Sequence, residues 1–245
     1  MNHLFKFVQF YKSVKENDVL TVEKLINSAK TSHPLKQIKF NDFIFNYYHD
    51  VRGNEHCPFC FESLDKENNP LITFKLNNDY YYLKIKEIQI LNKHIEISNI
   101  VHTNSLFDIN NFKLLSEIFP SFMIVYTDSK HVHYDLGLIE APILNRDATN
   151  TFNNVFLVDW ILETYLIKEK DFLDLVDEYN NLNKKINDKN KTYIFYKRGN
   201  KYYLYTIIHN ENITSFECIG FFNSLNENDS LSIQYNKALN RISLK

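Results

Sequence analysis

Two stretches of this chain place aromatic runs around a short turn, and this feature constrains the fold more than any other. LITFKLNNDYYYLKI covers residues 71–85, and TYIFYKRGNKYYLYTI covers residues 192–207. In each, runs rich in β-branched and aromatic residues flank a turn that contains Asn, which is typical of a β-hairpin. Residues 94–103 follow the first hairpin as a third strand. The likeness suits a duplicated unit, although any two hairpins of an aromatic-rich chain would look similar.

Other segments have the spacing of helices. Apolar residues recur at helical intervals in the N-terminal region and again in the centre of the chain. We expect helices at residues 3–16, 21–30, 42–53 (capped by Asn41), 104–119 and 151–186, the last interrupted near 168–171. Further strands are expected at 121–129, 131–142 and 213–222.

Helices and strands are segregated rather than alternating, which favours an α+β fold. We predict a helical N-terminal region, two antiparallel β-hairpin regions and a central helical segment, with a zinc knuckle. The expected parts are 1–53, 54–146 and 147–245, which could also pack as one compact unit.

Composition excludes several classes of protein. The net charge of −2 gives no overall attraction to nucleic acid or an acidic membrane surface. With four glycines, the chain has neither GxGxxG nor GxxxxGK[ST], the phosphate-binding loops of many nucleotide enzymes. No window is apolar enough for a signal peptide or a membrane span, so we expect a cytoplasmic protein. Residues with AT-rich codons are abundant, which indicates a low-GC bacterium, a phage or another mobile element.

The most specific motif is the pair Cys57 and Cys60 in NEHCPFC. Two cysteines spaced C-x2-C around a proline direct both sulfurs to one side of a turn, which fits tetrahedral Zn²⁺. Candidates for the remaining ligands are His49, His94 and His102. The motif resembles glutaredoxin and HNH nucleases, but the neighbouring residues are acidic and no histidine follows closely, which disfavours both. Two unligated thiols are the alternative.

A second cluster lies in HVHYDLGLIE. If this segment is a strand, His131, His133 and Asp135 share one face. Together with Glu140, they could hold a divalent metal with open positions. The alternative is a strand whose polar face meets solvent. H-x-H followed by Glu also resembles the cupins, but this Glu is too distant and a second cupin motif is missing.

The third candidate is the basic hairpin. Lysines and arginine there would neutralise phosphates while tyrosine rings stack on unpaired bases. The residues are Lys191, Tyr193, Tyr196, Lys197, Arg198, Lys201 and Tyr202. Lysines on a hairpin also guard a sheet edge against aggregation. An acidic run at 159–178 reads as the solvated face of a helix, or as a surface for another protein.

Two hypotheses follow. The first is a non-catalytic binding protein for nucleic acid or a nucleoprotein, stabilised by a structural zinc knuckle and acting in host–phage conflict. The second is a metal-dependent phosphodiesterase or nuclease that uses His131, His133, Asp135 and Glu140. A plain protein-interaction domain without metal is a third reading, and the sequence leaves open whether the protein is an enzyme.

Overall fold

A computed structural model describes most of the chain beyond residue 35. The described residues are 36–47, 72–76, 79–86, 90–99, 108–127, 132–152, 155–186, 190–210, 213–224 and 229–243. The helices expected at 3–16 and 21–30 lie outside these residues, as do Cys57 and Cys60.

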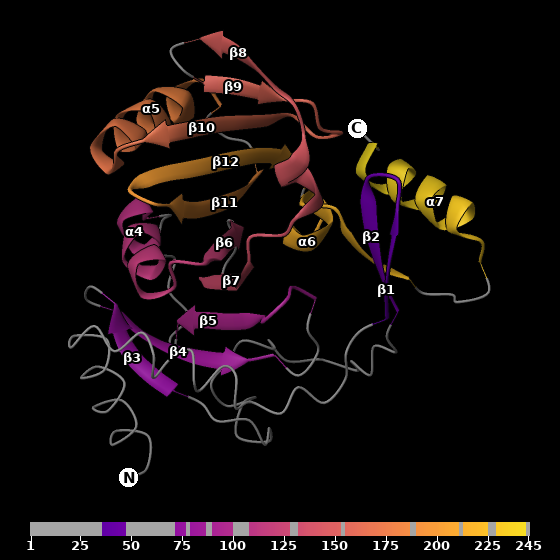
Figure 1. The fold of residues 1–245 in the computed structure, drawn as a ribbon, viewed down its shortest axis with the longest axis horizontal. Coiled ribbons are helices and arrows are strands. Elements are labelled where there is room, and N and C mark those ends of the chain that lie inside the picture. The colour runs from indigo at the N-terminus through magenta and orange to yellow at the C-terminus, as the bar shows by residue number, and fades with distance from the viewer. Residues whose placement is uncertain are drawn as a thin grey trace.

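A ten-stranded sheet, antiparallel throughout, forms the centre of the protein (Figure 1). Its spatial order is β3-β4-β5-β7-β6-β11-β12-β10-β9-β8. The strands are β3 (Ile72–Leu76), β4 (Asp79–Ile85), β5 (Ile95–Asn99), β6 (Phe122–Thr127), β7 (His133–Leu138), β8 (Ala148–Phe152), β9 (Val155–Val158), β10 (Thr164–Lys170), β11 (Asn190–Arg198) and β12 (Lys201–His209). Both predicted hairpins are confirmed as β3–β4 and β11–β12, and both belong to this sheet.

The sheet consists of two halves with the same topology. The first half runs β3-β4-β5-α4-β6-β7 along the chain, and the second runs β8-β9-β10-α5-β11-β12. Their spatial orders, 3-4-5-7-6 and 8-9-10-12-11, are equivalent. The halves meet where β6 pairs with β11, and similar residues face each other there: Thr127 with Thr192, Tyr126 with Tyr193, and Val125 with Ile194. The antiparallel pairing of β6 with β11, which are equivalent strands of the two halves, is what a two-fold relation between the halves produces.

Helices cover one face of the sheet. α4 (Ile109–Ile118) begins at Asp108, whose carboxylate accepts from the backbone N–H of Asn110, and α5 (Phe172–Lys185) follows β10. Both lie on the same side of the molecule in Figure 1. Their apolar residues pack on the sheet in one core, where the ring of Phe112 stacks on that of Phe195 at 5.3 Å.

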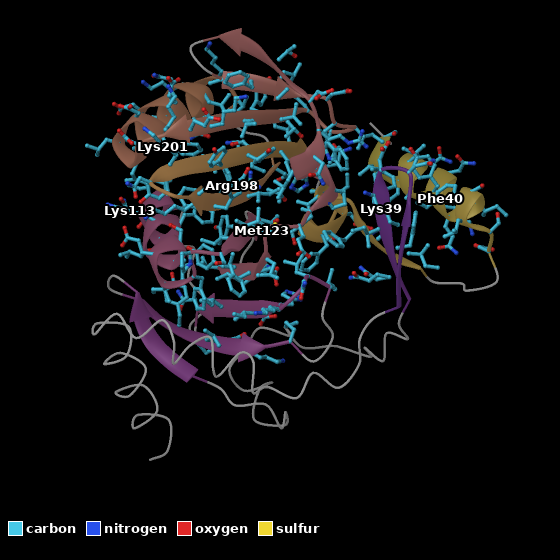
Figure 2. The ribbon with its side chains drawn as sticks, viewed as in Figure 1. Lys39, Phe40, Lys113, Met123, Arg198 and Lys201 are labelled. Atoms are coloured by element: carbon cyan, nitrogen blue, oxygen red, sulfur yellow. The ribbon has the colours of Figure 1, made fainter. Side chains whose placement is uncertain are left out.

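Smaller elements cover part of the other face. β1 (Lys36–Phe40), β2 (Phe43–Tyr47) and β13 (Phe221–Ser224) form a three-stranded sheet, joined by α6 (Ser215–Cys218), α7 (Leu231–Ser243) and a 3-10 turn (Pro142–Asn145). Met123 lies at the centre of the molecule between the layers, whereas Lys201 lies at its periphery (Figure 2).

The helix expected at 42–53 is wrong where the structure describes it. Lys36–Phe40 and Phe43–Tyr47 form a hairpin, and Asn41 lies in its turn with φ of 49°. Asn tolerates this left-handed conformation, so it favours a hairpin turn as readily as a helix cap. Phe43 and Phe45 are both buried, which is the alternation of a strand.

Two further assignments are corrected. Residues 151–152, 155–158 and 164–170 belong to β8, β9 and β10 rather than to a helix, because VFLV and TYLI are rich in residues that prefer strands. The strand expected at 213–222 begins instead with α6. There Thr214 and Glu217 form a capping box, in which each side chain accepts a hydrogen bond from the other's backbone N–H.

Within the described residues the fold is therefore mostly β, with little helix, and the predicted α+β class is wrong. Of the predicted helical N-terminal region, the part that the structure describes, residues 36–47, is a β-hairpin. The three-part organisation stays a prediction, although the large sheet takes strands from both 54–146 and 147–245. Among the described residues, no helix has the length and apolar content needed to cross a bilayer.

Candidate functional site

The HVHYD segment lies on β7, near the middle of the sheet. Tyr134 and Leu136 point into the core beneath α4, and their ring and side chain are almost fully buried. Because side chains alternate along a strand, His133 and Asp135 lie together on the opposite face. His131 is outside the described residues.

Asp135 is buried and contacts two histidines. Its Oδ1 lies 2.9 Å from Nε2 of His94, a hydrogen-bond distance. Its Oδ2 lies 3.7 Å from Nε2 of His133, which is an ion-pair distance. His94 is fully buried, with its ring edge against Phe216 of α6, whereas 14% of the His133 side chain is exposed. Of the two imidazoles, His133 is the one that a substrate can reach.

A second buried carboxylate lies directly across from Asp135. The β5–β7 register places Glu96 opposite Asp135, and Ser98 opposite His133. Nζ of Lys86 donates to Glu96 at 2.6 Å, and the hydroxyl of Tyr82 donates to it at 3.1 Å. We call His94, His133, Asp135, Glu96 and Lys86 the charge network.

Both carboxyl groups of the charge network favour the ionised state. Burial alone would raise the pKa of Asp135, but its hydrogen bond to His94 and the nearby positive charges outweigh burial and leave that pKa below its usual value. Burial likewise opposes ionisation of Glu96, and Lys86 overcomes it, so the pKa of Glu96 is also lowered. Two carboxylates then face one ammonium, an arrangement that stabilises positive charge on an adjacent imidazole.

The predicted metal site is described only in part, because His131 is not among the described residues. Among the described residues, no three His, Cys, Asp or Glu side chains are arranged to hold a metal ion. Glu140 is exposed beyond the end of β7, where its carboxylate accepts from Nδ2 of Asn92 at 3.4 Å. His131 lies outside the described residues, so the metal site of His131, His133, Asp135 and Glu140 stays a prediction; where the structure describes them, His133 and Asp135 belong to the charge network.

The zinc-knuckle ligands fall into two groups. Cys57, Cys60, His49 and His102 lie outside the described residues, so zinc stays a prediction. His94 is described, and it bonds Asp135.

The basic hairpin does not present its tyrosines to solvent. Tyr193, Tyr196 and Tyr202 are buried, because β11 and β12 are interior strands covered on both faces. Lys191 is also buried, and its Nζ donates to Oδ1 of Asn183 at 2.7 Å. The other charged residues of the hairpin make contacts within the protein. Lys197 lies over the ring of Tyr202 and Arg198 over the ring of Tyr196, while Lys201 forms an ion pair with Asp171. Nucleic-acid bases therefore cannot stack on these buried rings.

A shallow pocket of about 240 Å³ lies near the smaller sheet. Its lining includes Trp160 and Arg146, whose guanidinium lies 5.4 Å from the indole centroid and pairs with Asp42. Nε1 of Trp160 donates to the backbone carbonyl of Cys218 at 2.9 Å, which fixes the ring. None of the charge-network residues lines this pocket.

Sequence reasoning found His133 and Asp135 but assigned His94 to zinc and missed Glu96 and Lys86. His94 and Asp135 are 41 positions apart, and Glu96 faces Asp135 through the pairing of β5 with β7. The local signal was a strand, IEISN, in which Glu96 is the one charged residue and lies between two isoleucines. A lone Glu in such a strand suggests a buried charge that needs partners.

The sequence matches no protein-family profile and no curated protein. Solved structures do resemble the fold. A crystal structure of yeast Ap4A phosphorylase Apa2 aligns with a TM-score of 0.54 and 14% identity, covering 95% of this chain and 94% of that chain. The same protein in complex with Ap4A gives 0.55 and 13%, covering 88% and 90%. Its complex with AMP gives 0.53 and 10%, covering 100% and 98%.

This likeness over nearly the whole chain shows a shared fold. It contradicts the prediction of a non-catalytic, zinc-stabilised protein for nucleic acid or a nucleoprotein, since the solved structures that share the fold are those of a phosphorylase. Within the described residues the chain has the fold of Ap4A phosphorylase, with a charge network on one half of its sheet.

Proposed function

We propose that this protein is an enzyme that binds a nucleotide and catalyses transfer at one of its phosphates, with His133 as the reacting group. One observation carries the proposal: a partly exposed imidazole lies beside a buried carboxylate, which a second, fully buried histidine holds in place. An exposed reactive group supported by buried, perturbed ionisable groups is typical of an active site rather than of a structural ion pair.

The proposed reaction follows from the charges around His133. A neutral imidazole is a nucleophile that can attack phosphorus, so that an N–P bond forms while the P–O bond to the departing phosphate breaks and its electron pair leaves with that oxygen. The ring gains positive charge in this step. The carboxylate of Asp135 stabilises that charge, since it is already ionised and positioned before the reaction begins. Attack by inorganic phosphate or water then forms a new P–O bond, breaks the N–P bond and restores the ring.

The fold supports a nucleoside phosphate as the substrate class. Yeast Ap4A phosphorylase, whose fold this chain shares, has been crystallised with Ap4A and with AMP. A dinucleoside polyphosphate contains phosphoanhydride bonds, whose cleavage provides the good leaving group that the imidazole step requires. We therefore infer that the substrate carries a nucleoside joined to a phosphoanhydride.

The test is turnover of Ap4A in the presence of inorganic phosphate, followed by chromatography of the released nucleotides. We expect nucleotide products from the native protein, and His133→Asn should reduce the rate by about a thousandfold. Glu140→Gln is the matched control, since Glu140 is exposed just beyond the same strand, and it should stay near the native rate.

Two results would contradict the proposal. One is that the native protein neither turns over Ap4A nor binds AMP. The other is that His133→Asn, shown to be folded by its melting temperature, retains the native rate.

A further inference from the structure

A row of hydrogen-bonded side chains crosses from the second half of the sheet to the neighbourhood of His133. Oγ1 of Thr127 lies 2.7 Å from Oγ1 of Thr192, and Oγ1 of Thr192 lies 3.0 Å from Nε2 of His209. Thr127 belongs to β6, and the β6–β7 register that pairs Tyr126 with Tyr134 places it next to His133 on the same face. The row thus ends beside the reactive imidazole.

Which group donates and which accepts along this row is determined at its far end, by His209. Nδ1 of His209 lies 2.8 Å from the backbone carbonyl oxygen of Asn210. A carbonyl has no proton to give, so Nδ1 carries the proton and donates. In the neutral ring the other nitrogen, Nε2, is then an acceptor, and the hydroxyl of Thr192 must donate to it.

The remaining bonds follow because each hydroxyl has a single proton. The hydroxyl of Thr192 donates its one proton in the hydrogen bond to His209, so the Thr192 oxygen accepts a hydrogen bond from Thr127. Cys218 is its other hydrogen-bond partner, and burial raises the pKa of that thiol to about 12, so the thiol keeps its proton and can donate to the Thr192 oxygen. The proton of Thr127 is therefore engaged with Thr192, and toward a ligand at this partly exposed residue its oxygen can act only as an acceptor.

We propose that Thr127 is a hydrogen-bond acceptor in the substrate site and contacts a sugar hydroxyl of the nucleotide rather than a phosphate. An ionised phosphate oxygen can only accept, so it cannot pair with an oxygen whose proton is committed elsewhere. A sugar hydroxyl can donate to it. This inference rests on the proposed function, and it makes His209 and Thr192 positioning residues that act through Thr127.

We call the hydrogen-bonded row from His209 through Thr192 to Thr127 the relay. The chain provides a matched control for it. Thr192 and Thr206 are both fully buried threonines on neighbouring strands. Thr206 pairs with Tyr193, whose ring lies in the core beneath the helices, so its side chain is on the opposite face from Thr192. Replacing either threonine by valine removes one buried hydroxyl, but only Thr192→Val interrupts the relay.

The closing experiment measures binding of AMP, 2′-deoxy-AMP and 3′-deoxy-AMP by calorimetry. With the native protein we expect one of the two deoxy analogues to bind roughly fivefold to tenfold more weakly than AMP. Thr127→Val should abolish this preference, Thr192→Val should weaken it, and Thr206→Val should retain it. Equal binding of all three ligands, or a preference unchanged in Thr127→Val, would overturn the sugar contact.

A second measurement tests the relay independently of any ligand. In ¹⁵N spectra of the histidine rings, His209 should show a protonated Nδ1 and an unprotonated Nε2 at neutral pH. The Nε2 signal should shift in Thr192→Val and stay in place in Thr206→Val. A protonated Nε2 would overturn the relay itself, whereas failure of AMP to bind with these signals as expected would overturn the proposed function instead.

Discussion

The two halves of the sheet share a topology but differ in what their equivalent strands carry. Between β5 and β7 in the first half, Glu96 faces Asp135 and Ser98 faces His133. Between β10 and β12 in the second half, the ladder pairs Leu166 with Tyr205 and Ile167 with Leu204, and it contains no Asp, Glu or His. The same backbone arrangement therefore holds a charged site on one side and an apolar core on the other.

This difference separates two tasks. The second half packs tyrosine rings on the face where the first half has charges: Tyr196 stacks on Tyr203 at 4.8 Å and lies near Tyr205. Burial of such rings stabilises the fold, whereas each buried carboxylate opposes folding unless its partners stay in place. We infer that the second half stabilises the fold in which the buried charges of the first half are held.

The largest expected effect that tests this comparison is on turnover. Asp135→Asn keeps the shape of the side chain but removes the negative charge beside His133, so kcat/KM should fall by about a hundredfold or more. Tyr205→Phe, on the corresponding strand β12, should change kcat/KM by less than about threefold. Similar losses in both variants would show that the halves share the catalytic task.

The second prediction compares ion pairs by stability. Lys86→Met leaves Glu96 buried without its ammonium and should lower the free energy of unfolding by about 3 kcal/mol, since side chains in this pair are 21% and 3% exposed. Lys201→Met in the second half breaks a pair exposed by 50% and 68% and should cost less than about 1 kcal/mol. Urea unfolding measures both. Equal costs would contradict the distinction between buried and exposed charge.

The smallest predicted effect is on acid stability. The pKa values of Asp135 and Glu96 are lowered in the fold, so their ionised forms add stability above the unfolded pKa of about 4, and this is lost as pH falls through the lower native pKa. Unfolding free energy measured from pH 6 to pH 3 should therefore decline less steeply in Asp135→Asn. Asp171→Asn, in an exposed pair of the second half, should keep the native slope.

Local patterns predicted much of the secondary structure but not how it assembles. The hairpins at β3–β4 and β11–β12 were evident from aromatic alternation, and their likeness suggested a duplication. A duplication of topology exists, but it relates β3–β4 to β8–β9 and β6–β7 to β11–β12. The sequence likeness between β3–β4 and β11–β12 thus reflects shared strand composition rather than equivalent positions.

For the candidate site, too, local sequence patterns predicted the parts but not how they come together. Alternation along β7 was enough to place His133 and Asp135 on one face. Their partners His94 and Glu96 come from a strand distant in sequence, and strand register is set by the whole sheet rather than by local spacing. The buried tyrosines of the basic hairpin were misjudged for a related reason: position at the centre of a sheet, which decides exposure, has no local signature.

The seam between β6 and β11, where like residues face each other, resembles the isologous contact of a homodimer. Alone, the first half would leave the backbone N–H and C=O groups of β6 open, and such an edge recruits another copy of itself. In the intact chain the matching edge belongs to the same polypeptide, with Thr127 and Thr192 65 positions apart, so the pairing needs no second molecule. Covalent linkage also frees each half to diverge, and this is what allows the charge network to lie in one half, where a symmetric pair of chains would carry it twice.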